Sequence, residues 1–222
     1  MHPITARPRS LVRSVAGGRT GAGFTLVEAM VTLAVFAILL AVGVPRMADW
    51  VAATKAAAAT QFYAEGLTLA RAQALAHNSA SRLVLSANAV SGQYDWRVDL
   101  CFPTPDAPCS DEAGDWSTTD DAVSPAQAAG DGVKSIARSA DALPGTDRLA
   151  VSTGPDDDTA VYFTPLGWVD TLAASRMMRI DLEPADADAA AFPAASVVLT
   201  LAGVAARCDP AAPAGDSRRC PE

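Results

Sequence analysis

Histidine is nearly absent from this chain of 222 residues, which contains only His2 and His77. A serine or cysteine nucleophile would have to be activated by His77, and no nucleophile motif accompanies it. His77 falls at the end of a predicted helix, where a histidine interacts favourably with the helix dipole. We therefore expect no catalytic residue and interpret the chain as a protein that is not an enzyme.

Ligand spacings typical of metal sites are also missing. The run Asp156-Asp157-Asp158 lacks the spacing of an EF-hand and follows Gly154-Pro155, which favours a solvated turn over a calcium site. We predict neither a metal nor a cofactor. The four tryptophans permit a carbohydrate platform, but Trp50 on a predicted helix and Trp96 on the apolar face of a predicted strand favour packing roles.

Acidic residues are absent from the first 23 positions, which contain Arg7, Arg9, Arg13 and Arg19. From Phe24 onward 13 basic residues face 25 acidic ones, so that portion carries a net charge of about −12. Half of all residues are hydrophobic, which is enough for one globular domain with a sizeable core and excludes a disordered chain.

A long hydrophobic run extends from Phe24 to Val44 and is interrupted by Glu28. Its 21 residues would cover about 31 Å as a helix, enough to cross the hydrocarbon layer of a membrane. The preceding arginines place residues 1–23 in the cytoplasm and export the chain after Val44. A cleaved secretory signal would have a shorter core followed by a cut site, so it fits poorly. An uncleaved signal anchor remains the alternative.

All four cysteines follow this run, where an oxidising compartment favours disulfides over metal ligands. Three connectivities are open, and spacing alone does not decide among them. We favour Cys101–Cys109 and Cys208–Cys220, because each closes a short loop rich in Pro and Asp that has little hydrophobic content to hold it.

Beyond Pro45 the Ala-rich sequence stays helical in character to about Asn78, so together with the run from Phe24 it predicts a helix of roughly 50 residues. Proline removes a backbone hydrogen bond, so we expect a kink or local melting next to Gly43. A stripe that can face a partner surface consists of Met47, Val51, Phe62 and Leu69, with Glu65 on the same side.

After residue 80 the hydrophobic pattern has a period of two, as in strands with one buried face. Seven strands are expected, at residues 81–86, 93–100, 147–152, 159–164, 176–182, 195–201 and 204–208. The last two would pair as a hairpin through Ala202-Gly203. Between Cys101 and about Gly145 the composition predicts a long, partly irregular excursion.

The stretch "GFTLVE" resembles the signal of type IV prepilins and pseudopilins: a basic leader ending in Gly23, then Phe24, with Glu28 as the fifth residue of an apolar helix. The resemblance implies that a prepilin peptidase cuts between Gly23 and Phe24 and that Phe24 is N-methylated. It also implies that Glu28 pairs with the amino terminus of an adjoining subunit. Pro45 matches a proline that follows the membrane span in this family.

The remainder resembles the GspH/FimT branch of minor pseudopilins and minor pilins in "ARAQALAHNSASRLVL", "YFTPLGWVD" and "VVLTLAGVAARC". This implies an α+β, pilin-like fold, in which a long N-terminal helix packs on a C-terminal antiparallel β-sandwich. The expected parts are a leader at 1–23, a transmembrane half-helix at 24–44, a periplasmic half-helix at 45–78 and a β-rich periplasmic domain at 79–222.

The function implied is a minor pseudopilin of a type II secretion pseudopilus, first held in the inner membrane and then in the filament. A FimT-like minor pilin of type IV pili is the alternative. The partners implied are other pilin-type subunits, prepilin peptidase, the assembly platform and inner-membrane lipid. DNA-binding relatives carry a Gly-Arg-x-Arg pattern that this chain lacks at Gly203–Arg207. A basic patch would require Arg207, Arg218 and Arg219, so DNA is the less favoured partner.

Overall fold

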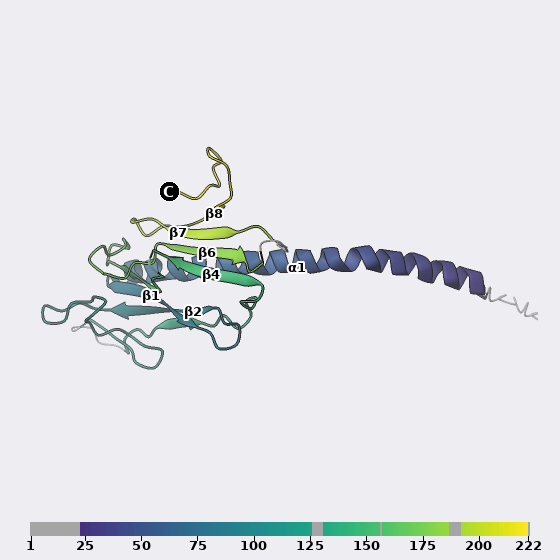
Figure 1. The fold of residues 1–222 in the computed structure, drawn as a ribbon. Coiled ribbons are helices and arrows are strands. Elements are labelled where there is room, and N and C mark those ends of the chain that lie inside the picture. Colours follow the sequence, from purple (N-terminus) through teal and green to yellow (C-terminus); the bar gives the residue numbers. More distant parts are fainter. Residues whose placement is uncertain (1–22, 126–130, 156, 187–191, 222) are drawn as a thin grey trace, which may run out of the picture. The chain divides into compact units, whose positions relative to one another are not determined.

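The computed structural model describes residues 23–125, 131–155, 157–186 and 192–221 (Figure 1). The chain divides into two compact units, Met1–Val44 and Pro45–Glu222, which we describe separately. Unit 1 is described from Gly23 onward, so the first 22 residues of the expected leader lie outside the described part. Unit 2 contains both β-sheets and the helical residues that pack on them.

The helix α1 extends over Leu26–His77. Thr25 caps its start, because its Oγ1 accepts a hydrogen bond from the backbone nitrogen of Glu28 at 3.2 Å. Its end is formed by Asn78, which has a left-handed φ of 46°, and by a bond from the Ser79 nitrogen to the Ala74 carbonyl. Residues on both sides of Pro45 are helical, so the local melting expected there is not seen.

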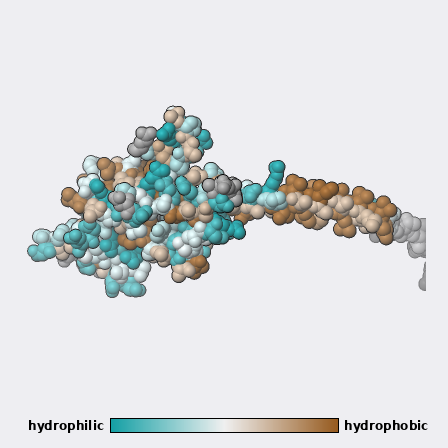
Figure 2. Space-filling view, viewed as in Figure 1, coloured by the Kyte–Doolittle hydropathy of each residue, from teal (hydrophilic) through white to brown (hydrophobic). Residues whose placement is uncertain are grey.

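By length and composition, α1 contains a segment that could cross a membrane. From Phe24 to Val42 every residue is exposed within unit 1. Figure 2 shows hydrophobic side chains covering this segment on the face in view.

Small residues dominate the face of α1 that is buried in unit 2. This face consists of Ala56, Ala59, Thr60, Phe62, Tyr63, Gly66, Leu67, Ala70 and Ala74. Of the stripe expected from the sequence to face a partner surface, Phe62 belongs to this buried face, whereas Met47 and Val51 are 66 % and 42 % exposed. Burial follows the small positions because the sheets approach the helix closely there. A Cβ on Gly66 would lie 3.1 Å from atoms of Leu83 and Trp96.

Eight strands form two four-stranded antiparallel sheets. The first sheet has the order β3-β2-β1-β5 and consists of β1 (Ala80–Ala87), β2 (Tyr94–Cys101), β3 (Ile136–Arg138) and β5 (Ala160–Phe163). The second has the order β4-β6-β7-β8 and consists of β4 (Leu149–Gly154), β6 (Arg179–Pro184), β7 (Ala195–Leu199) and β8 (Ala205–Cys208).

All seven expected strands are present with shifted ends, and β3 was missed because it lies inside the expected excursion. The β7–β8 hairpin is confirmed, with Leu199 opposite Ala205. Its turn is wider than Ala202-Gly203, since Thr200 and Val204 also bond across it and the Gly203 nitrogen donates to the Thr200 carbonyl. Gly203 has a φ of 75°, and a Cβ on it would lie 2.1 Å from the Gly167 oxygen, so only glycine fits.

One hydrophobic core is shared by α1 and both sheets. Its larger members are Phe62, Tyr63 and Leu67 from α1, Leu83, Trp96, Val98, Val161 and Phe163 from the first sheet, and Leu149, Ile180, Leu182, Val197 and Leu199 from the second. The α+β, pilin-like fold expected from the sequence is confirmed, with a long helix packed on two antiparallel sheets.

Candidate functional site

The first turn of α1 carries the residues expected to govern processing and assembly. Phe24 is 83 % exposed, and Glu28 is exposed one turn further along the chain. The bond from the Glu28 nitrogen to Thr25 Oγ1 is one half of a Thr-x-x-Glu capping box. Glu28 also lies where the helix dipole favours a negative charge. The spacing in "TLVE" could have indicated this capping role, which sequence analysis missed.

Pro45 lies inside α1 and has no backbone N–H to donate to the Ala41 carbonyl. The helix therefore has one hydrogen bond fewer at this point. Arg46 and Asp49 follow it, so charged residues begin directly after the apolar segment.

A buried carboxylate lies where the excursion between β2 and β3 covers the first sheet. Asp99 is fully buried and accepts hydrogen bonds from Arg82 Nε at 2.9 Å and from Arg97 Nε at 2.6 Å. A further bond comes from the hydroxyl of Ser135 at 2.7 Å, in the excursion itself. The Asp99 carboxylate raises the pKa of Arg97 by hydrogen bonding. This cluster ties the excursion to β1 and β2.

Trp116, in the earlier part of the excursion, packs against the first sheet. The Arg82 guanidinium lies 4.4 Å from the centre of a Trp116 ring, and Trp116 meets Tyr162 edge to face at 5.7 Å. The Cys101–Cys109 disulfide closes a short loop at the start of the excursion, before Trp116. It is one of the two local bridges favoured from the sequence. The excursion is thus a covering layer on the first sheet.

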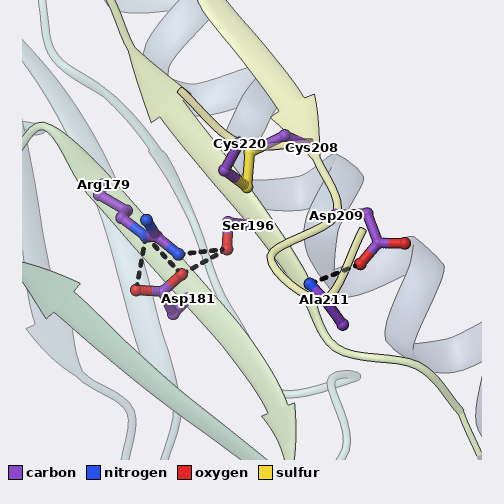
Figure 3. Close-up of a disulfide and its surroundings, with 7 residues drawn as sticks. All are labelled: Arg179, Asp181, Ser196, Cys208, Asp209, Ala211 and Cys220. Carbon is purple, nitrogen blue, oxygen red and sulfur yellow. Dashed lines mark hydrogen bonds and ion pairs between the residues drawn. A yellow bond between two sulfur atoms is a disulfide. The ribbon is translucent and has the colours of Figure 1, made fainter. Parts of the chain in front are cut away.

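The second disulfide, Cys208–Cys220, joins β8 to the C-terminal segment (Figure 3). Beside it, Arg179 Nε donates to both carboxylate oxygens of Asp181, and the Ser196 hydroxyl also donates to Asp181. This polar group connects β6 to β7 and consists of residues that already satisfy one another. Arg179, Asp181 and Ser196 therefore stabilise the contact between the two strands, and the charges of Arg179 and Asp181 are paired with each other.

The three arginines considered for DNA binding are only partly brought together. Arg207 and Arg218 line one hollow of about 300 Å³, but Asp209 lines it too. Arg218 donates through its guanidinium to Asp216, and this lowers the pKa of Asp216 to about 2. Arg219 lies opposite Asp209 in a short parallel bridge of the backbone. The expected basic patch is therefore interleaved with carboxylates.

The acidic run Asp156-Asp157-Asp158, considered as a calcium site, is described from Asp157 onward. The turn expected there is present, since the Asp158 nitrogen donates to the Pro155 carbonyl at 3.1 Å and Asp157 is exposed. Asp158 itself is half-buried and accepts bonds from the Ser175 hydroxyl and the Arg176 nitrogen, and Asp156 lies outside the described residues. Within the described ranges, no group of three His, Cys, Asp or Glu side chains could hold a metal ion.

The two tryptophans assigned to packing have different environments. Trp96 is 3 % exposed and packs 5.8 Å from Phe62, centre to centre, as expected for a core residue. Trp50 is 69 % exposed, so the packing role expected for it is not met within unit 2.

Comparison with known proteins gives two matches, one after the other along the chain. A family model described as the prokaryotic N-terminal methylation motif matches residues 19–44. A model described as type II transport protein GspH matches residues 58–203, about two thirds of the chain. No curated protein and no solved structure matches significantly.

Proposed function

We propose that this chain, which belongs to the family of the type II transport protein GspH, is a minor pseudopilin of a type II secretion pseudopilus. The observation that carries the proposal is the order of the two matches: the methylation motif ends at residue 44, and the GspH match begins at residue 58, both on α1. A methylation motif and a GspH domain are thus parts of one chain.

Processing in this proposal removes residues 1–23 by cleavage between Gly23 and Phe24, followed by N-methylation of Phe24. Gly23 suits the cut, because it has no side chain to obstruct the close approach of a prepilin peptidase. The apolar segment 24–44 then holds the subunit in the inner membrane, with the rest of the chain in the periplasm. The two disulfides fit an oxidising compartment.

Assembly depends on Glu28 in this proposal. An ionised carboxylate inside a helical membrane span costs up to roughly 3 kcal/mol at the centre and less near the edge. Pairing with the methylated amine of a neighbouring Phe24 removes that cost in the filament. Since a misaligned neighbour would leave the charge unpaired, Glu28 also sets the register of the subunits.

The work proposed for the chain is mechanical and involves no catalysis. Its partners are the other pseudopilins, the prepilin peptidase and the inner-membrane assembly platform. Unit 2 would supply the contacts between subunits outside the membrane.

Intact-mass analysis of the protein purified from its native membrane tests the processing. We expect the mass of residues 24–222 with both disulfides and one added methyl group. A mature chain that retains residues 1–23 would contradict the proposal and favour an uncleaved signal anchor.

Deletion of the gene separates secretion from piliation. We expect loss of exoprotein release with twitching motility and DNA uptake unchanged. Loss of twitching with normal secretion would overturn the secretion assignment and support the FimT-like alternative.

DNA binding is tested by a gel shift at low salt with the purified chain. We expect no retardation, because the mature chain has a net charge of about −12 and Arg218 is paired with Asp216. Retardation that is lost when Arg207, Arg218 and Arg219 are all changed to alanine would support the DNA-binding alternative.

A further inference from the structure

An apolar groove lies on unit 2 beside the first helical turns after Pro45. We call it the helix-start groove; its volume is about 510 Å³, within the range of roughly 300–1,000 Å³ that accommodates small-molecule ligands. Its lining includes Met47, Val51, Lys55, Leu143, Arg148 and Phe192. Met47 and Val51 are largely exposed, so the apolar wall of the groove is open to its surroundings. The groove can therefore take up an apolar chain from outside the domain.

The groove begins close to the residue at which the proposed membrane span ends. Pro45 is the first residue of unit 2 and is bonded to Val44, the last residue of the apolar segment. Within unit 2, Met47 and Val51 lie about 3 Å and 9 Å further along α1. The headgroup layer on each side of a bilayer is roughly 5–7 Å thick. Covalent connection alone therefore brings the Met47 side of the groove to the level of lipid headgroups while the chain is held in the membrane.

Trp50 gives a second, independent indication of lipid at this level. Its side chain is 69 % exposed, so packing within unit 2 does not account for it. It lies three positions after Met47, which makes the two side chains neighbours on the surface of α1. Tryptophan is enriched at membrane–water interfaces, where its ring lies at the level of the headgroups. An exposed tryptophan beside an apolar groove is thus typical of a surface that faces lipid.

Two cationic side chains border the groove. Lys55 is exposed and forms no ion pair with any residue that the structure describes. Arg148 Nε lies 3.8 Å from Asp147 Oδ2, and both side chains are largely exposed, so this pair is weak. Because Asp147 also lines the groove, Lys55 and Arg148 leave a net of only one positive charge there. What the two cations offer is direct hydrogen bonding to a phosphate group, not attraction over a distance.

We infer that the helix-start groove holds one acyl chain of a membrane phospholipid, whose phosphate accepts hydrogen bonds from Lys55 and Arg148. The inference rests on the proposed membrane span, because the lipid comes from the periplasmic leaflet in which that span ends. It adds a contact between lipid and the exported domain to the contacts of the span itself. A subunit that leaves the bilayer for a filament gives this lipid up, so the contact favours the membrane-held form.

A photo-reactive phospholipid tests this contact directly. The purified full chain is reconstituted into phosphatidylcholine vesicles that contain a small fraction of phosphatidylglycerol with a diazirine in one acyl chain. After irradiation, the labelled peptides are identified by mass spectrometry. We expect label on 24–44 and also on a peptide containing 143–148, which belongs to the exported domain and is far from the span in sequence. Label on 24–44 alone overturns the inference, whereas the absence of label on 24–44 contradicts the membrane span itself and with it the proposed function.

A matched probe and matched variants separate phosphate recognition from apolar contact. A diacylglycerol with the same diazirine has no phosphate, so we expect it to label 143–148 on the order of fivefold less, relative to 24–44. K55Q combined with R148Q should reduce labelling by the phospholipid probe to a similar degree. K134Q, which neutralises an exposed lysine outside the groove, should leave the labelling unchanged.

Equal labelling of 143–148 by the two probes would show that no phosphate is bound there. Equal labelling of the double variant and the unaltered chain would show the same of Lys55 and Arg148. In either case the inference would be wrong, even if mass analysis and secretion assays support the pseudopilin function.

Discussion

At the scale of a single residue, Glu28 belongs to the cap of α1 and is proposed to pair with the amine of a neighbouring subunit. Substitution separates these two roles. E28A and E28Q both remove the charge, so we expect incorporation into filaments to fall on the order of tenfold in each. T25A removes the cap that Thr25 Oγ1 provides but keeps the carboxylate, so it should reduce incorporation much less. Immunoblots of sheared filaments, normalised to the membrane pool, measure the effect.

The glutamine variant decides between the explanations. Gln keeps the length and hydrogen-bonding capacity of Glu without its charge. Normal incorporation of E28Q alongside defective E28A would show that polarity, not pairing with a neighbour's amine, is what assembly requires.

Asp99 is the residue whose loss should destabilise unit 2 most directly. D99A leaves Arg82 and Arg97 without their buried partner, and we expect the free energy of unfolding to fall by about 2–4 kcal/mol. R97A should cost less, because Arg82 and Ser135 still satisfy the carboxylate. Denaturant unfolding of the full chain in detergent, followed by tryptophan fluorescence, measures both. Equal losses for the two variants would contradict this ranking.

The sequence motif identified Glu28, but nothing in it indicated Asp99. Asp99 belongs to the polar face of β2, and the period-two pattern assigns that face to solvent. The face is buried because the excursion returns over it, bringing Ser135 to Asp99 and Trp116 to Arg82. Burial of this kind depends on a contact between segments distant in sequence, which alternation within one strand does not encode.

At the scale of elements, the packing of α1 on the sheets depends on Gly66. Ala normally stabilises an exposed helix interior by about 1 kcal/mol relative to Gly. Here the new Cβ would lie 3.1 Å from Leu83 and from Trp96, so overpacking should outweigh propensity. We expect G66A to lower the free energy of unfolding by about 1–2 kcal/mol.

The exposed helical position Thr68 provides the control for this substitution, measured in the same denaturant experiment. T68A removes only a bond from the Thr68 hydroxyl to the Ala64 carbonyl and should change stability little. A stabilised G66A variant would show that the helix can move away from the sheet without cost.

Small residues also explain why the elements were predicted better than their contacts. The strands were found because apolar and polar residues alternate along them. The buried face of α1 was not predicted, because Ala59, Gly66 and Ala70 have small side chains that give a weaker hydrophobic pattern than Met47 and Val51. The strand β3 has only three residues, all exposed, and gave no periodic pattern.

For the molecule as a whole, alkaline pH should reduce stability through Tyr63. Burial is the main reason that the pKa of Tyr63 is raised from 10.0 to about 12. Between these values the unfolded chain loses a proton that the folded chain keeps, so folding becomes less favourable as pH rises. We expect a loss of about 2 kcal/mol by pH 12, measured by denaturant unfolding at a series of pH values.

Y63F is the matched variant for this dependence. It should be less stable at neutral pH, because the Tyr94 nitrogen loses the Tyr63 hydroxyl as its acceptor. Its stability should nevertheless change less between pH 10 and pH 12. An unaltered slope in Y63F would assign the alkaline loss to other groups.

The fold class could be predicted at this scale because two strong patterns coincide: one long apolar helix start and a series of short alternating strands. The surface that the excursion covers could not be predicted, because its Pro, Asp and Gly content indicates turns but not the sheet on which it packs. The structure places it on the outer side of the first sheet through Asp99 and Trp116.

Both disulfides join cysteines that are close in sequence, separated by 8 and 12 positions. Each bridge can consequently form from a short length of chain as soon as that length meets an oxidant, before any sheet has been completed. A disulfide from Cys101 or Cys109 to Cys208 or Cys220 would require segments about a hundred residues apart to meet first. Correct oxidation would thus follow the order of the chain from its N-terminus, and would demand little from enzymes that reshuffle thiols.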